Sequence, residues 1–260
     1  MSDEPAIRQG RADLHIHTLA SDGVSSVAEI LDHAERVALD VIAIADHERI
    51  DAALAARSMA EARGSRVAVI VGEEVTSRGG HVLGLFLTKR IKPWGSLRST
   101  VAQIHEQGGL AIMAHPLVPY PLCVSGRSIR NLLSEQDPIF HPDAIEAFNP
   151  TTAKMPWAAR VPAFAEEVGL PVIGGSDAHR AEDVGQALTT FPGRTMDDVR
   201  AALEAKATGW EGQPHTWRRQ LDMFMRQQRK NARAVGDTAR HRLLGVGMGR
   251  DLGYPRESRS

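Results

Sequence analysis

The sequence predicts an α/β fold in which about seven strands, largely parallel, nearly close into a barrel. Short apolar runs of strand length alternate with segments that have the 3.6-residue apolar spacing of a helix. The chain has 260 residues, which allows one large domain or one domain plus an extension, and its 42% hydrophobic content is ordinary for a globular protein.

The strands are expected at the short apolar runs. Arg11–His17 has Ala12, Leu14 and Ile16 on one face, as in a strand with one buried side. Val41–Ala45 is apolar at every position, which is typical of a strand that is buried on both faces. The remaining strands are expected at Val67–Val71, Val82–Leu87, Leu110–Ala114, Ala144–Phe148 and Val172–Gly174.

The helices are expected between these strands. Val27–Ala38 has helical apolar spacing, and Ser25 or Ser26 can cap its N-terminus. Pro116–Ser128 is rich in proline and is expected to form a loop over the barrel rim. Further helices are expected at Ala52–Arg63, Ser99–Gln107, Ile129–Leu133, Trp157–Val168 and Thr195–Ala205, with C-caps at Gly64, Gly108 and Gly169.

The strand–helix alternation stops near Trp210, so we expect a barrel domain at 1–209 and a basic extension at 210–260. The extension has eleven Lys or Arg and five Asp or Glu, whereas the rest of the chain is acidic. Thr216–Arg233 is predicted to be a helix with an apolar stripe, and Leu244–Ser260 is predicted to be poorly ordered.

The basic extension could contact nucleic acid or the acidic body itself. The stripe consists of Leu221, Phe224 and Met225, and it could pack on the barrel, a partner or a second subunit.

Cysteine content and hydropathy favour a cytoplasmic protein without a membrane partner. Cys123 is the only cysteine, which excludes an internal disulfide and any cluster of thiolate ligands. No apolar run approaches the ~18 residues of a membrane-spanning helix. The polar segment Met1–Gly10 lacks the apolar core of a secretory signal.

Histidines and carboxylates recur at the carboxyl ends of the predicted strands. Imidazole nitrogen and carboxylate oxygen together bind Zn, Mn and Fe, and barrel enzymes build their active sites at this rim. His81 is the exception because it begins its strand. The candidate metal ligands are His15, His17, Asp22, His47, Glu74, His81, His115, Asp177 and His179.

Several of these residues also have simpler interpretations. His15 and His17 are two apart, so they project from one face, but two surface histidines on an edge strand would have the same spacing. Asp22 could serve only a turn with Gly23, and His81 could face solvent. Glu73 is expected to point away from Glu74 and is left out. The other histidines are interpreted as surface or packing residues: His33, His105, His141, His215 and His241.

At these motifs the chain resembles the PHP family, named for polymerase and histidinol phosphatase, over roughly residues 12–205. The family's motifs occur here in order: His-x-His at His15 and His17, Asp-Gly at Asp22, Asp-His at His47, Gly-x-Glu at Glu74, a lone His at His81, His-Pro at His115 and Ser-Asp-x-His at Asp177 and His179.

The resemblance implies a distorted seven-stranded βα barrel, TIM-like, that holds up to three divalent ions of Mn, Zn or Fe. It implies a first ion at His15, His17, Glu74 and Asp177. Glu74 would bridge to a second ion, which His81 and His115 would complete, and Asp22, His47 and His179 would hold a third. The chain looks most like the small stand-alone phosphoesterases of the family, which act on nucleotides and short RNA ends.

The leading hypothesis is hydrolysis of phosphate monoesters, with nucleotides or short 5′-phosphorylated nucleic acids as substrates. A hydroxide that bridges two ions would attack phosphorus, and Asp177, His179 and His47 are the proposed catalytic residues. Asp13 and Asp46 are expected to orient ligand imidazoles. Arg127, Arg130 and Arg180 are candidates to bind the phosphate, although each could equally be an ordinary surface arginine.

Three alternatives remain open. The chain could be a phosphodiesterase or exonuclease that cuts RNA or DNA ends, with the basic extension contacting the nucleic acid. It could be a histidinol-phosphate phosphatase. It could also be a metal-binding interaction module, without catalysis, that acts through its C-terminal helix.

Overall fold

The computed structural model describes residues 8–120 and 122–216. The chain divides into two compact units, Met1–Pro214 and His215–Ser260. The predicted helix at Thr216–Arg233, apart from its first residue, and the tail at Leu244–Ser260 lie outside the described residues. Among the described residues, no helix has the length and apolar character that crossing a membrane requires.

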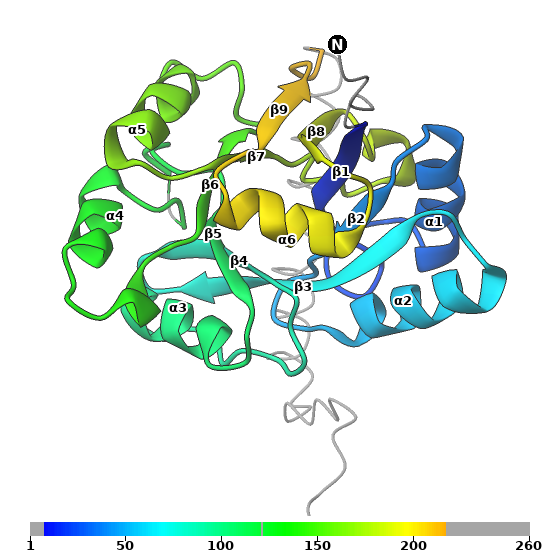
Figure 1. Cartoon of the computed structure of the whole chain (residues 1–260), viewed down its shortest axis with the longest axis horizontal. Helices are drawn as coiled ribbons and strands as arrows, with labels where there is room; N and C mark the ends of the chain where they lie inside the picture. Colours follow the sequence, from blue (N-terminus) through cyan, green and yellow to red (C-terminus); the bar gives the residue numbers. More distant parts are fainter. Residues whose placement is uncertain (1–7, 121, 217–260) are drawn as a thin grey trace, which may run out of the picture. The chain divides into compact units, whose positions relative to one another are not determined.

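A nine-stranded sheet forms the centre of the first unit in the described residues (Figure 1). Its strand order is β7-β6-β5-β4-β3-β2-β1-β8-β9. The strands are β1 (Gln9–Ile16), β2 (Val41–Ile44), β3 (Ala68–Ser77), β4 (Gly80–Leu85), β5 (Leu110–Met113), β6 (Ala144–Phe148), β7 (Val172–Gly174), β8 (Ala187–Pro192) and β9 (Gly209–Gly212).

The sheet curls until β7 meets β1 and β8, which confirms the predicted α/β class and the nearly closed barrel. Ile16 at the end of β1 forms an isolated bridge with Ala178, just beyond β7. The Thr189 hydroxyl on β8 donates a 2.9 Å hydrogen bond to the carbonyl of Gly174 on β7. Both contacts join opposite ends of the strand order, so the sheet behaves as a barrel.

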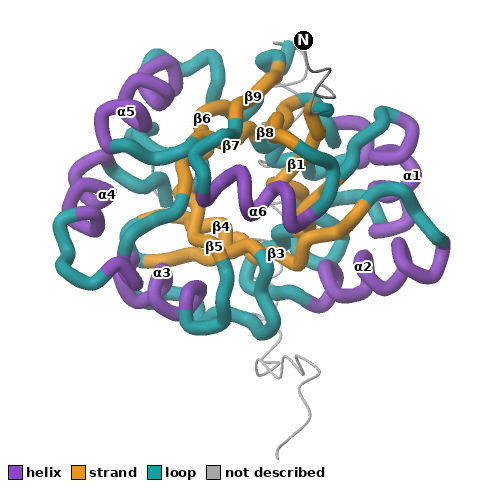
Figure 2. Tube along the Cα trace, in the orientation of Figure 1, coloured by secondary structure: helices purple, strands orange, loops and turns teal. Residues whose placement is uncertain are grey.

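Five of the α-helices lie around the outside of the strands, and the last α-helix crosses in front of them (Figure 2). Ser26 caps the first with a capping box that includes Glu29, and Gly64 and Gly169 end two others in the left-handed conformation. The α-helices are α1 (Val27–Arg36), α2 (Asp51–Arg63), α3 (Leu97–His105), α4 (Gly126–Leu133), α5 (Val161–Val168) and α6 (Met196–Glu204), with short 3-10 turns at Pro138–Phe140, Ala158–Arg160 and Ala181–Asp183.

Two apolar clusters stabilise this arrangement. One lies between the helices α1–α5 and the outer face of the strands. The other fills the barrel with strand residues such as Leu14 and Ile112, together with Val199 and Leu203 of α6. Helix α6, which crosses in front of the strands in Figure 1, therefore contributes to the interior core of the barrel.

The number and direction of the strands differ from the prediction of seven largely parallel strands. β4 is antiparallel to β3 and β5, and β8 is antiparallel to β1 and β9. Only Arg78 and Gly79 separate β3 from β4, and so short a connection makes a hairpin and leaves no room for a crossover helix. The strand pattern also continues beyond residue 209, because β9 pairs with β8 at the edge of the sheet.

Candidate metal centre

The barrel gathers all nine predicted ligands at the ends of its strands. His15 belongs to β1, Glu74 to β3 and His81 to β4. The others lie in the connections that follow strands: His17 and Asp22 after β1, His47 after β2, His115 after β5, and Asp177 and His179 after β7. Four overlapping sets of three residues result, and within each set the potential ligand atoms lie within 4.8 Å of one another: His15, His17 and Asp177; His17, Asp22 and His179; His17, His47 and Glu74; and Glu74, His81 and His115.

The first group consists of His15, His17, Glu74 and Asp177 and is largely interior, with the Asp177 side chain 15% exposed. His15 and His17 are 0% exposed. His15 Nε2 lies 3.4 Å from Glu74 Oε2 and 3.6 Å from Asp177 Oδ1. His17 Nε2 lies 3.3 Å from each of the same two oxygens. Two imidazoles and two carboxylates therefore converge on one point from three separate strands.

These separations suit a bound ion better than direct hydrogen bonds. Ligand atoms about 2.1 Å from a metal are about 3.0–3.4 Å apart in octahedral or tetrahedral geometry. Both ring nitrogens of His17, and Nε2 of His15, are buried without a hydrogen-bond partner among the described residues. Buried polar atoms are nearly always partnered, so the donor set fits a divalent cation.

Glu74 connects this group to a second one. Its other oxygen, Oε1, lies 2.7 Å from His81 Nδ1 and 3.1 Å from His115 Nε2. Each oxygen of one carboxylate thus faces a different set of imidazoles. This is the arrangement that a bridging ligand between two ions requires. His81 does not face solvent, since its side chain is only 12% exposed.

The third group surrounds Asp22. Its Oδ2 lies 3.0 Å from His179 Nε2 and 3.7 Å from His47 Nε2. The His17 ring stacks between those of His47 and His179, at centroid distances of 4.8 and 4.5 Å. His47 also presents Nδ1 to Glu74 Oε2 at 3.4 Å, so it stands between the first and third groups.

The buried carboxylates of the cluster favour the binding of positive charge. Burial alone would raise the pKa of Glu74 and of Asp177, but the neighbouring imidazoles, His15 foremost, hold each pKa well below its ordinary value. Burial lowers the pKa of His17, yet the carboxylates of Asp177 and Glu74 outweigh it and raise that pKa to about 10. Protons or divalent cations can supply the charge that these carboxylates attract.

Two supporting residues were missed in the sequence. Glu146 on β6 is 1% exposed, and its Oε1 accepts a 2.8 Å hydrogen bond from His15 Nδ1. Asn149 donates to both Glu146 and Asp177. A carboxylate within the otherwise apolar segment Ala144–Phe148 was the signal available, because a buried charge needs partners.

The roles expected for Asp13 and Asp46 were wrong. Asp13 accepts from the backbone amides of Ser176 and Gly185, and thereby ties β1 to the segments beyond β7. Asp46 accepts from the amide and hydroxyl of Thr18 and from the hydroxyl of Ser21. Both carboxylates therefore fix backbone around the cluster, and neither hydrogen-bonds to a ligand imidazole.

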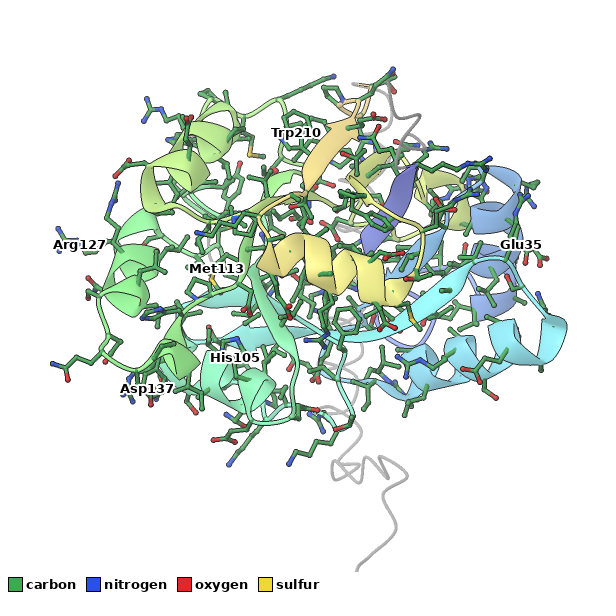
Figure 3. All side chains as sticks on the ribbon, in the orientation of Figure 1. Glu35, His105, Met113, Arg127, Asp137 and Trp210 are labelled. Carbon is green, nitrogen blue, oxygen red and sulfur yellow. The ribbon has the colours of Figure 1, made fainter. Side chains whose placement is uncertain are left out.

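Two of the three candidate arginines lie on α4, away from the nine candidate ligands. Arg127 lies on α4 at the outer edge of the first unit (Figure 3). Arg130, also on α4, pairs with Glu167 at 2.7 Å and lies over the Phe164 ring. Arg180 directly follows His179 and contacts Glu182 at 3.3 Å. Of the three, only Arg180 is adjacent to a ligand.

Family comparisons match two segments of the chain. A model described as "PHP domain" matches residues 13–122, and one described as "PHP-associated" matches residues 157–208. An uncharacterized protein of Methanocaldococcus jannaschii is 36% identical over 120 residues, which are 42% of this chain and 69% of that protein. A 5′-3′ exoribonuclease of Haemophilus influenzae is 31% identical over 108 residues, 38% of this chain and 37% of the enzyme.

A solved structure shares the fold. It is a two-domain protein of Bacteroides vulgatus, described as containing a predicted PHP-like metal-dependent phosphoesterase, and it is 20% identical with a TM-score of 0.64. The similarity covers 79% of this chain and 65% of that protein, so the chain spans about two thirds of its length.

Proposed function

The chain belongs to the PHP family, and on this basis we propose that it is a metal-dependent phosphoesterase that hydrolyses phosphate monoesters. The observation that carries the proposal is the position of Glu74, whose two oxygens face separate groups of imidazoles. Such a carboxylate can hold two ions side by side, as hydrolysis of phosphate esters at polynuclear sites requires.

The ligands are assigned by group. His15, His17, Glu74 and Asp177 would hold one ion, and Glu74, His81 and His115 a second. Asp22, His47 and His179 would hold a third. Mn, Zn and Fe all suit these nitrogen and oxygen donors. Such ions supply Lewis acidity, which lowers the pKa of water and offsets phosphate charge.

Exposure suggests the direction from which the substrate enters. The side chains of His47 and His179 are 27% and 31% exposed, whereas His15 and His17 are buried. A phosphate that enters from solvent would meet His47 and His179 first. These two side chains are therefore proposed to stabilise the leaving oxygen. Asp177 would help to hold the first ion at the reacting centre, and Arg180 would lie near the phosphate.

Nucleotides and short 5′-phosphorylated nucleic acids are the proposed substrates. The support is the similarity to the H. influenzae exoribonuclease, which covers the matched residues only. The same similarity favours cleavage of phosphodiesters as the second candidate function. A cytoplasmic reaction is proposed because a single cysteine accords with a reducing compartment.

The test is release of inorganic phosphate in the presence of Mn²⁺ from nucleoside monophosphates, a 3′,5′-bisphosphorylated nucleoside, histidinol phosphate and short 5′-phosphorylated RNA. Phosphate release from nucleotides would support the proposal. Cleavage of RNA without phosphate release would favour the diesterase. No reaction with any substrate would contradict both.

The matched variants are Asp177→Asn and Asp197→Asn. Asp177 is a proposed ligand, and replacing its carboxylate by the amide of asparagine should lower turnover by at least about 100-fold. Asp197 is exposed on α6 without a side-chain hydrogen bond, so its variant should match the wild type. Unchanged turnover in Asp177→Asn would refute the ligand assignment.

A further inference from the structure

Glu146 contacts two candidate ligands from within the barrel wall. Its Oε1 accepts from His15 Nδ1 at 2.8 Å, and its Oε2 accepts from the backbone amide of His115 at 2.8 Å. His15 belongs to the first group of ligands and His115 to the second. One buried carboxylate therefore reaches two groups without occupying either.

The contact with His15 selects the form of the imidazole that can bind a metal. A carboxylate only accepts hydrogen bonds, so His15 Nδ1 carries the proton. The lone pair of Nε2 then points at Glu74 and Asp177, which are 3.4 and 3.6 Å away. Such hydrogen bonds fix the tautomer and the ring orientation of a ligand histidine.

Asn149 extends the contact to a third ligand. Its amide nitrogen donates to Glu146 Oε2 at 3.2 Å and to Asp177 Oδ2 at 3.3 Å. Its carbonyl oxygen accepts from the Thr151 amide at 2.9 Å, which sets the orientation of the side-chain amide. Asp177 thus keeps Oδ1 for the imidazoles while Oδ2 is held.

The backbone around Glu146 is shaped to receive it. A Cβ atom on Gly175 would lie 2.4 Å from Glu146 Oε1 and 2.7 Å from the Cβ of His15, so only glycine fits there. His115 and Asp177 have φ of 29° and 51°, a region that residues other than glycine seldom adopt. Glu146 accepts the hydrogen bond from the His115 amide and Asn149 donates one to Asp177 Oδ2, and these two bonds stabilise both residues in these conformations.

We propose that Glu146 and Asn149 are a positioning pair that fixes His15, His115 and Asp177 and so sets the geometry of the first two ion positions together. The proposal rests on the proposed metal chemistry of this site. It assigns to neither residue a direct contact with metal or substrate. Loss of Glu146 should weaken both ion positions, whereas loss of Asn149 should chiefly weaken the first.

Glutamine cannot replace Glu146 in this role. Three donors point at the carboxylate: His15 Nδ1, the His115 amide and the Asn149 amide. A glutamine has one acceptor oxygen and one NH₂ group, so at least one donor would face another donor. Aspartate keeps both acceptor oxygens but is one methylene shorter, and should recover part of the function.

The experiment compares Mn²⁺ binding by the full chain and its variants Glu146→Gln, Glu146→Asp and Asn149→Ala. Calorimetry gives affinity and elemental analysis gives ions per chain. Glu146→Gln should bind Mn²⁺ about 10- to 100-fold more weakly, with Glu146→Asp in between. Glu61→Gln and Asn131→Ala are the controls, because both residues are exposed on helices.

Melting temperatures with Mn²⁺ and with chelator separate positioning from a merely structural role. In Glu146→Gln the difference between the two temperatures should shrink. An equal fall of both temperatures, or wild-type Mn²⁺ affinity in this variant, would overturn the proposal.

A wild-type chain that binds no Mn²⁺ would also overturn the proposal. A wild-type chain that binds Mn²⁺ but releases no phosphate would contradict only the proposed function, since the binding comparison needs no substrate.

Discussion

His105 on α3, outside the metal centre, has an acceptor at each ring nitrogen. Nδ1 lies 2.7 Å from the Ile139 carbonyl and Nε2 lies 2.7 Å from Asp143 Oδ2. Only the imidazolium can donate to both at once. Burial lowers the pKa of His105, but the hydrogen bond and charge of Asp143 outweigh it and raise the pKa above its ordinary value.

We predict that His105 stabilises the fold at acidic pH and loses this effect as pH rises. A pKa that is higher in the folded state gives stability that is complete below the unfolded value of about 6.5 and is lost as pH rises through the folded value. His105→Gln should cost about 1.5–3 kcal/mol at pH 6 and less at pH 9. Urea unfolding at both pH values measures the difference.

His33→Gln is the control for this prediction. Burial, and then the charge of Arg36, lower the pKa of His33. The stability that His33 contributes should therefore persist as pH rises. A penalty for His105→Gln that is equal at pH 6 and pH 9 would show that the histidine is neutral in the fold.

The nine candidate ligands could be proposed residue by residue because all of them except the lone His81 lie in short local motifs such as His-x-His or Asp-x-His. The role of Glu146 could not be predicted, because a single carboxylate in an apolar strand forms no motif with its neighbours in the sequence. Its contacts with His15 and His115 span 131 and 31 positions of the chain. Arg127 and Arg130 are exposed on α4, whereas Ile129 and Leu132 are buried, so the apolar pattern of this helix already indicates that both arginines lie outside its buried side.

At the scale of elements, the strands with an apolar run or a clear apolar alternation were predicted from the sequence, and the two strands without either were missed. β8 carries Thr189 and Thr190, both buried, and the Thr189 hydroxyl bonds to the backbone of β7. Polar residues thus interrupt its apolar pattern. β9 has only four residues, two of them glycine, so it has no period that could be recognised.

Strand β9 is held to the sheet by an aromatic pair. The rings of Trp210 on β9 and Phe148 on β6 are stacked, with centroids 4.8 Å apart and an interplanar angle of 9°. Figure 3 labels Trp210 on this strand at the sheet edge. We predict that Trp210→Ala destabilises the first unit by at least about 0.5–1.5 kcal/mol, the usual contribution of such a ring pair beyond burial.

Glu211→Ala tests whether the ring pair, rather than the strand itself, accounts for the loss. Glu211 is exposed on the same strand, and its removal should change stability by less than about 0.5 kcal/mol. Chemical denaturation of both variants gives the comparison. Equal stability of Trp210→Ala and the wild type would mean that the ring pair adds nothing to the stability of the fold.

At the scale of the whole first unit, the candidate metal centre joins segments from many parts of the barrel. Its candidate ligands come from β1, β3 and β4 and from the connections after β1, β2, β5 and β7. The carboxylates Asp22, Glu74 and Asp177 lie within 3.7 Å of several imidazoles. An ion in this cluster would therefore cross-link strands that are distant in the sheet order.

Removal of metal should consequently lower the melting temperature of the whole barrel. An ion that binds only the folded state adds about 2.7 kcal/mol when its concentration is 100 times its dissociation constant. For a chain of this size that corresponds to roughly 5–10 °C. Differential scanning calorimetry with EDTA, and again after excess Mn²⁺ is restored, measures the shift and its reversal.

The variant Asp177→Asn separates binding in the cluster from general effects of the ion. Asp177 faces both His15 and His17, so Asp177→Asn should reduce the difference between the melting temperatures in Mn²⁺ and in EDTA. Asp197→Asn should retain the wild-type difference. Identical melting in EDTA and in Mn²⁺ would exclude the cross-link. A cluster that binds ions at strand ends around the barrel would thus make catalysis and stability depend on the same residues.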